Sequence, residues 1–152
     1  AARVNERQRL LMVEKIRKAL EGLRGKTVAL LGLSFKPNTN DIREAPALTI
    51  AERLLAEGAV LRVYDPTALE EGTKVLRGAI PCADAYDAAR GADALVLVTE
   101  WNQFRNLDFA RIKTALRRPI LIDLRNVYEP DRIAALGFHY VSVGRAPRKP
   151  SS

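Results

Sequence analysis

Residues 27–46 read TVALLGLSFKPNTNDIREAP, and this stretch decides the fold. Its first part, Val28 to Leu33, is a short apolar run typical of a strand that is buried on both faces. Turn-forming residues follow from Pro37 to Asp41, where a fixed φ or local hydrogen bonding breaks regular structure. Pro46 suits the first position of a helix, where the missing N–H is not needed. The stretch therefore predicts a strand, a loop and a helix in succession.

The loop of this unit carries two cations, Lys36 and Arg43. They lie between the carboxyl end of the predicted strand and the amino end of the predicted helix. Open α/β sheets bind anionic ligands at that place, because helix N-termini offer free N–H groups and a favourable dipole. The loop is therefore the first candidate for a ligand site.

The same alternation of apolar runs and helical patterns continues along the chain. Helices are predicted near 4–23, 46–57, 68–72, 84–90, 106–116 and 130–136, and strands near 60–64, 75–80, 94–98, 119–123 and 140–143. Strands that alternate with helices indicate a mainly parallel sheet with right-handed crossovers. We therefore expect a Rossmann-like, doubly wound α/β/α domain of three layers, preceded by an N-terminal helix.

The composition is that of an ordinary globular domain, with 152 residues, 47% hydrophobic and 28% charged. The net charge of +7 comes from cations scattered among acids, so we expect no nucleic-acid binding, whereas a phosphorylated small ligand would suit it. No apolar run approaches the roughly 20 residues that span a bilayer, and we expect no membrane association. A single cysteine, Cys82, excludes an intramolecular disulfide, and a cytoplasmic protein is expected.

The N-terminal helix has a broad apolar face. Val13, Ile16 and Leu20 recur at helical spacing, and the run 10–12 widens this face. The helix could pack on the domain itself or on a partner that the chain does not contain. The breadth of the face favours the second interpretation.

Polar residues follow the predicted strands at the carboxyl ends, where such sheets bind ligands. Lys36 and Arg125 come from different strands, and Arg43 joins them at a helix start. Three cations on one edge suit a diphosphate, because charge-assisted hydrogen bonds to phosphate are strong. The alternative is that each is an ordinary surface cation paired with a neighbouring acid.

The sequence does not indicate a dinucleotide site, a reactive cysteine or a metal site on this chain. The glycine-rich dinucleotide turn is reduced to Gly32, so this domain should not hold a dinucleotide by its own first turn. Asp65 stands where a ribose-binding acid would stand, or it simply starts a turn before Pro66. Cys82 has no histidine near it in sequence, so we interpret it as a structural thiol. We interpret His139 as a residue that contributes to packing. No metal-ligand spacing occurs, so no metal site is expected. No catalytic triad can be assembled either, so no catalytic residue is expected on this chain.

Several motifs in order resemble the UDP-glucose/GDP-mannose dehydrogenase family, in its C-terminal nucleotide-sugar-binding domain. They are residues 4–8 (VNERQ), 32–46 (GLSFKPNTNDIREAP), 63–66 (VYDP), 99–101 (TEW), 122–126 (IDLRN) and 140–144 (YVSVG). The resemblance implies that residues 1–24 are the end of the family's central interdomain and dimerisation helix. It implies a UDP-sugar-binding domain over 25–145, and the composition of 146–152 predicts a disordered tail.

The resemblance also implies an activity for the full-length protein. The family oxidises the C6 alcohol of a sugar nucleotide to a carboxylate with two NAD molecules. It holds NAD on a separate N-terminal domain, whose cysteine traps the aldehyde in a Gly-x-Cys-Phe-Pro motif. That motif is absent here, so the chain alone is expected to be inactive. A homodimer is expected for the full-length protein.

Site residues follow from the resemblance position by position. Phe35, Lys36 and Arg125 match substrate-contacting residues, and Arg43 matches an arginine that reaches toward NAD. The chain departs from the pattern at Ala45, often serine, where a helix cap is lost. UDP-glucose is the expected ligand. The alternatives are a UDP-N-acetylhexosamine, GDP-mannose, or a freestanding nucleotide-sugar-binding module without redox activity.

Overall fold

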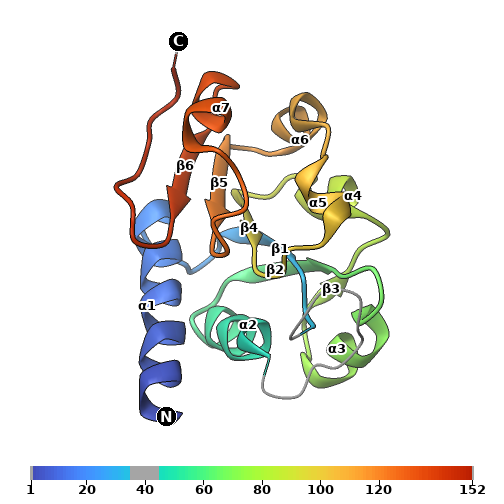
Figure 1. The fold of residues 1–152 in the computed structure, drawn as a ribbon. Helices are drawn as coiled ribbons and strands as arrows, with labels where there is room; N and C mark the ends of the chain where they lie inside the picture. Colours follow the sequence, from blue (N-terminus) through green and yellow to red (C-terminus); the bar gives the residue numbers. More distant parts are fainter. Residues whose placement is uncertain (1, 35–44, 152) are drawn as a thin grey trace.

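The computed structural model describes residues 2–34 and 45–151, with helices and strands alternating along the chain (Figure 1). The helices are α1 (Ala2–Leu20), α2 (Pro46–Ala56), α3 (Leu69–Val75), α4 (Ala85–Ala89), α5 (Asn102–Arg105), α6 (Phe109–Ala115) and α7 (Pro130–Ala135). The strands are β1 (Thr27–Leu31), β2 (Val60–Tyr64), β3 (Ile80–Pro81), β4 (Ala94–Leu97), β5 (Ile120–Asp123) and β6 (His139–Ser142).

The strands form one sheet in the order β3-β2-β1-β4-β5-β6, and every described pairing between them is parallel. The sheet begins at β1 in the middle, and the chain then runs outward to β3 before it crosses back to β4 on the other side of β1. This reversal places β1 and β4 side by side. Loops leaving them at their carboxyl ends diverge, and that is where doubly wound sheets have their ligand crevice.

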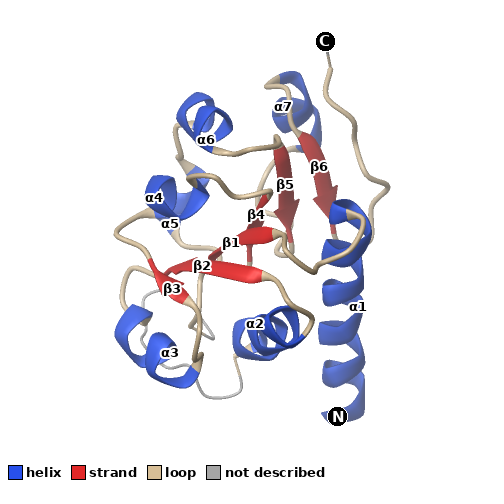
Figure 2. Cartoon of the chain, turned by 180° about the vertical axis from the view of Figure 1, so that it is seen from behind, coloured by secondary structure: helices blue, strands red, loops and turns tan. Residues whose placement is uncertain are grey.

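Helices cover both faces of the sheet (Figure 2). Successive strand residues point to opposite faces, so Val28 and Leu30 enter one apolar cluster while Ala29 and Leu31 enter the other. The first cluster lies under α1 and α2, and the second under α4, α6 and α7. The predicted three-layer parallel α/β architecture is confirmed.

Most elements start and end near their predicted bounds, and two of the helices have aspartate N-caps. The carboxylates of Asp84 and Asp108 accept hydrogen bonds from the amides of Asp87 and Arg111, at 2.7 and 3.1 Å. The predicted strand over 75–80 is wrong, because α3 extends to Val75 and only Ile80 and Pro81 pair with β2. The short helix α5 was not predicted, because one turn is too short to show a period.

The N-terminal helix packs on the domain, which corrects the interpretation of its apolar face. Val13, Ile16 and Leu20 are at most 1% exposed and belong to the core under α1 and α2. Nε and Nη2 of Arg17 also bind the two carboxylate oxygens of Glu57 at 2.9 and 2.6 Å, which ties α1 to the end of α2. Leu10 and Leu11 remain 41% and 57% exposed.

The end of the chain differs from the predicted disordered tail. Arg148 forms an antiparallel bridge with Tyr140 in β6, and the amide of Ser151 donates to the carbonyl of Ala134 at 2.8 Å. Arg148 also pairs with Asp131 at 2.5 Å. These are mostly backbone bonds, which any sequence can make, so the Pro-, Lys- and Ser-rich composition could not reveal them.

Candidate functional site

The loops that leave the parallel strands meet at one edge of the sheet, called here the carboxyl edge. Backbone bonds continue past the strands, from the amide of Val98 to the carbonyl of Leu31 and from that of Leu124 to the carbonyl of Leu97, at 2.9 and 3.0 Å. The exits of β1, β4 and β5 therefore lie next to one another. We refer to 32–34 as the β1 exit, to 98–101 as the β4 exit and to 124–128 as the β5 exit.

The β1 exit packs tightly on the strand beside it. Gly32 has φ of +101°, and a Cβ built on it would lie 2.5 Å from Cβ of Thr99 and 2.7 Å from its amide nitrogen. Both the backbone angle and the space require glycine. The glycine thus serves a close approach between two strand exits of this sheet.

Asp65, at the end of β2, holds the β1 exit from one side. Its side chain is buried at 2% exposure, and Oδ2 accepts from the amides of Leu33 and Ser34 at 2.8 and 3.2 Å. Oδ1 accepts from the amides of Thr67 and Ala68 at 2.9 and 2.8 Å. Both oxygens are thus engaged by backbone, so Asp65 is a structural anchor and is not presented to a ribose.

Thr99, at the end of β4, holds the β1 exit from the other side. It is buried, and its Oγ1 donates to the carbonyl of Ser34 at 2.9 Å. The chain is therefore fixed where it enters the predicted ligand loop. Phe35, Lys36 and Arg43 lie in that loop, outside the described residues.

The β5 exit, which carries Arg125, is held by Asp123. This carboxylate is fully buried and accepts from the amides of Arg125 and Tyr128 at 3.0 and 2.9 Å. The hydroxyl of Tyr140 donates to it at 2.7 Å. Burial and the neighbouring Asp123 carboxylate raise the pKa of Tyr140 above its ordinary value. The Tyr140 hydroxyl therefore stays protonated and remains a donor at neutral pH.

Asn126 completes the β5 exit. Its φ of 54° is left-handed, a conformation that asparagine tolerates better than most residues. Its side-chain amide makes two reciprocal bonds with the backbone of Val143, both at 3.0 Å. Arg125 thus stands on a loop whose backbone is fixed on both sides.

Arg125 reaches across the carboxyl edge to the β4 exit. Its Nη2 contacts Oε1 of Glu100 at 3.1 Å, and Oε2 of Glu100 contacts Nη2 of Arg105 at 3.5 Å. The side chains of Arg125, Glu100 and Arg105 are 44%, 35% and 49% exposed. One acid therefore bridges two arginines at the surface.

The β4 exit also carries an unsatisfied donor. Trp101 is 7% exposed, and its Nε1 has no hydrogen-bond acceptor in the part of the chain that the structure describes. A buried indole N–H usually finds an acceptor. Trp101 follows Glu100 directly, so this donor belongs to the same strand exit as the bridging acid.

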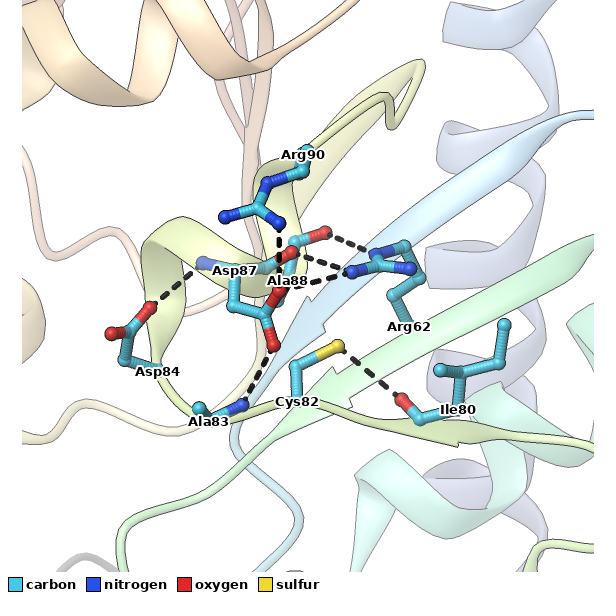
Figure 3. Close-up of polar contacts among 8 residues, drawn as sticks. All are labelled: Arg62, Ile80, Cys82, Ala83, Asp84, Asp87, Ala88 and Arg90. Carbon is cyan, nitrogen blue, oxygen red and sulfur yellow. Dashed lines mark hydrogen bonds and ion pairs between the residues drawn. The ribbon is translucent and has the colours of Figure 1, made fainter.

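Cys82 lies beside α4 and has the environment of a structural thiol (Figure 3). It is 2% exposed, and its Sγ lies 3.5 Å from the carbonyl of Ile80. Burial raises the pKa of the thiol above its ordinary value, which disfavours the thiolate, although Arg62 acts in the opposite direction. The guanidinium of Arg62 instead binds the carbonyls of Asp87 and Ala88 at the end of α4, at 2.8 and 3.2 Å.

Among residues 2–34 and 45–151, no three histidine, cysteine or acidic side chains gather as metal ligands would. None of the helices described here combines the length and the apolar character needed to cross a bilayer.

A shallow groove lies between α1 and α2, away from the strand exits. It is lined by Glu6, Leu10, Thr49, Glu52, Arg53 and Ala56. None of these residues follows the carboxyl end of a strand, so this groove is separate from the candidate site.

Sequence reasoning placed Arg125 at the carboxyl edge correctly but missed most of what surrounds it. Thr99 and Tyr140 belong to the motifs 99–101 and 140–144, but neither motif indicated their contacts, and Tyr128 gave no signal. Asp123 ends a strand, as Asp65 does, and an aspartate at the end of an apolar run is the pattern that could have identified both as loop anchors. Glu100 lies in the motif 99–101, which gave no indication of its partner Arg125.

The parallel sheet, the helices on both faces and the loops at the carboxyl edge define a Rossmann-like α/β domain. The sequence matches the UDP-glucose/GDP-mannose dehydrogenase family, UDP binding domain, over residues 29–130. The chain belongs to this family.

Similar proteins have related names. The chain is 46% identical over 143 residues to a UDP-glucose 6-dehydrogenase of Rhizobium meliloti, and 47% identical over 148 residues to one of Pseudomonas aeruginosa. Each alignment covers 93% of this chain and 33% of the relative. The chain therefore spans about a third of the length of these curated relatives.

Solved structures agree with this assignment. The fold is similar to a UDP-glucose dehydrogenase from Pyrobaculum islandicum, with a TM-score of 0.71 and 34% identity over 80% of this chain and 27% of that one. It is also similar to a UDP-D-ManNAc dehydrogenase from Pyrococcus horikoshii, with a TM-score of 0.76 and 26% identity over 94% of this chain and 32% of that one.

Proposed function

We propose that this chain is the nucleotide-sugar-binding domain of an NAD-dependent UDP-glucose 6-dehydrogenase. The full-length protein would convert UDP-glucose to UDP-glucuronate with two NAD. The observation that carries this proposal is the match of nearly the whole chain, at 46% and 47% identity, to two relatives of that name. The family match to a UDP binding domain supports it independently.

The proposed ligand site is the carboxyl edge. Phe35 and Lys36 would contact the sugar nucleotide just beyond the anchored β1 exit, and Arg125 would reach it from the β5 exit. Arg43 would lean toward NAD held by another domain. The fixed backbone on both sides of Arg125 supports this role, because a positioned donor loses little entropy on binding.

This domain does not fit NAD by itself. A dinucleotide turn needs glycines beside the pyrophosphate and a free acid for the ribose. Here the tight turn has Gly32 alone, and the oxygens of Asp65 are engaged by backbone amides. We therefore assign NAD binding and the covalent chemistry to an N-terminal domain of the full-length protein. We also propose that the full-length protein acts as a homodimer in the cytoplasm. Cys82 has no part in that chemistry.

Two alternatives concern the ligand and the role. The similarity to a UDP-D-ManNAc dehydrogenase supports a UDP-N-acetylhexosamine as the second candidate substrate, ahead of GDP-mannose. A freestanding binding module without redox activity would also use the carboxyl edge. A measurement of NAD reduction separates a binding module from a dehydrogenase. A full-length dehydrogenase containing this domain should reduce NAD in the presence of UDP-glucose.

Calorimetric titration of this chain tests the proposal. We expect weak binding of UDP-glucose and UDP and weaker binding of GDP-mannose, because half of the cleft is supplied by another domain. Arg125→Ala should weaken UDP-glucose binding about tenfold, the loss of one charge-assisted hydrogen bond. Arg90→Ala removes the same charge from a side chain that is 78% exposed just after α4, and it should leave the binding of each ligand unchanged. A preference for GDP-mannose would overturn the substrate assignment.

A further inference from the structure

The contact between Arg125 and Glu100 changes what the candidate site can recognise. Glu100 follows β4 and Arg125 follows β5, and these strands are neighbours that pair at Leu97 and Asp123. The carboxylate of Glu100 faces Arg125 through Oε1 and Arg105 through Oε2. One negative charge therefore stands between two positive charges at the place where the sequence predicted cations alone.

The ion pair is not needed to hold the fold. Exposed pairs of this kind contribute roughly 0–1 kcal/mol to stability. The backbone of the β5 exit is held by Asp123 and Asn126 instead, and that of the β1 exit by Asp65 and Thr99. Arg125 and Glu100 can thus exchange their mutual contact for a ligand at small cost.

The chemistry of the pair selects between the parts of a nucleotide sugar. A guanidinium only donates hydrogen bonds and an ionised carboxylate only accepts them. A phosphate group is an anion whose oxygens mainly accept, so it would bind Arg125 but be repelled by Glu100. A sugar hydroxyl both donates and accepts, so two neighbouring hydroxyls can donate to Glu100 while accepting from Arg125.

We propose that Arg125 and Glu100 together bind neighbouring hydroxyl groups of the nucleotide sugar, with Glu100 as the acceptor, and do not bind its diphosphate. This rests on the proposed function, and it refines the expectation that Arg125 serves the diphosphate with Lys36 and Arg43. The hydroxyls belong either to the ribose or to the hexose. Both offer the same chemistry to the pair.

The test is a set of calorimetric titrations of this chain with UDP-glucose, UDP and inorganic pyrophosphate. Glu100→Gln keeps the size and one acceptor oxygen but removes the charge. It should weaken UDP-glucose binding about tenfold, the loss of a charge-assisted hydrogen bond, while pyrophosphate binding stays the same or tightens. If Glu100→Gln also weakens the binding of UDP, the hydroxyls belong to the ribose. If it weakens the binding of UDP-glucose alone, they belong to the hexose.

The matched control is Asp131→Asn, which makes the same charge change in the exposed pair with Arg148. It should leave every titration as in the native chain, and both variants should keep the native melting temperature. If Glu100→Gln tightens UDP-glucose and pyrophosphate equally, or changes neither, the inference is wrong while the proposed function stands. If the native chain binds neither UDP-glucose nor UDP, both fall.

Discussion

The β1 exit and the β5 exit are both held in place by a buried aspartate, but the aspartate comes from a different part of the chain in each case. Each is an irregular segment at the carboxyl edge, and each is held by a buried aspartate, Asp65 or Asp123, at 2% and 0% exposure. Asp65 comes from the neighbouring strand β2 and binds the amides of a segment more than thirty residues earlier. Asp123 belongs to the strand that its own loop leaves, and binds amides two and five residues later.

The difference concerns what each loop depends on. The β1 exit is held only if β2 is correctly paired beside β1, so its conformation is tied to the assembled sheet. At the β5 exit the amides of Arg125 and Tyr128 are held locally by Asp123, and longer-range contacts come from the hydroxyl of Tyr140 and from the pairing of Asn126 with Val143. We therefore expect substitutions at the β1 exit to affect the whole domain and those at the β5 exit to have smaller, more local effects.

The largest effect is expected for Asp65→Ala. It removes a carboxylate that four backbone amides use, and buried donors left without acceptors cost about 1–3 kcal/mol each. With partial access of water, we expect the free energy of unfolding to fall by about 4 kcal/mol in urea titrations. Asp93→Ala is the control, since Asp93 is also buried and accepts from the amide of Thr27. Equal losses in the two variants would contradict the anchoring role.

Gly32→Ala should have the next largest effect, about 3 kcal/mol. It combines a strained positive φ with an overlap against both the side chain and the backbone of Thr99. Gly78→Ala provides the comparison, because Gly78 has a similar φ of +94° but no atom within 4 Å of the added Cβ. Its loss in urea unfolding should be about 1 kcal/mol. If the two losses agree, then close packing at the β1 exit contributes nothing.

Tyr140→Phe should have the smallest effect, about 1 kcal/mol at neutral pH, because it removes one hydrogen bond to Asp123. The pKa of Tyr140 is raised in the folded state, so its contribution is complete below the ordinary tyrosine pKa of about 10 and is lost as the pH rises above that value. Unfolding measured at neutral pH and above pH 10 should therefore show the gap between native and variant narrowing. A constant gap would mean that Tyr140 ionises as freely in the native state as in the unfolded one.

The sheet could be predicted from sequence because its strands are short apolar runs between turn signals, as 94–98 and 119–123 show. The class of the fold followed from their alternation with helices. The contacts of the site could not be predicted, because they depend on strand order. Glu100 meets Arg125 only because β4 lies beside β5, and Thr99 meets the β1 exit only because β4 lies beside β1.

The resemblance to the family assigned ligand-binding roles to Phe35, Lys36 and Arg43, which the residue patterns alone could not assign. These three roles stay predictions. For Arg125 the pattern placed the residue but not its charge environment. A cation at a strand end indicates an anion site when it is considered alone, and the facing Glu100 alters that interpretation. The order of residues along the chain does not show that the negative charge of Glu100 offsets the positive charge of Arg125.

The bridge between Arg148 and Tyr140 also covers one edge of the sheet against pairing with a strand of another chain. The two outermost strands of an open sheet carry free N–H and C=O groups on which another chain can add a strand. On one side β3 is only two residues long and contains Pro81, which lacks the N–H needed for pairing. On the other side the final residues cover part of β6 and add the cations Arg148 and Lys149. The last residues of the described chain thus act against strand-to-strand aggregation.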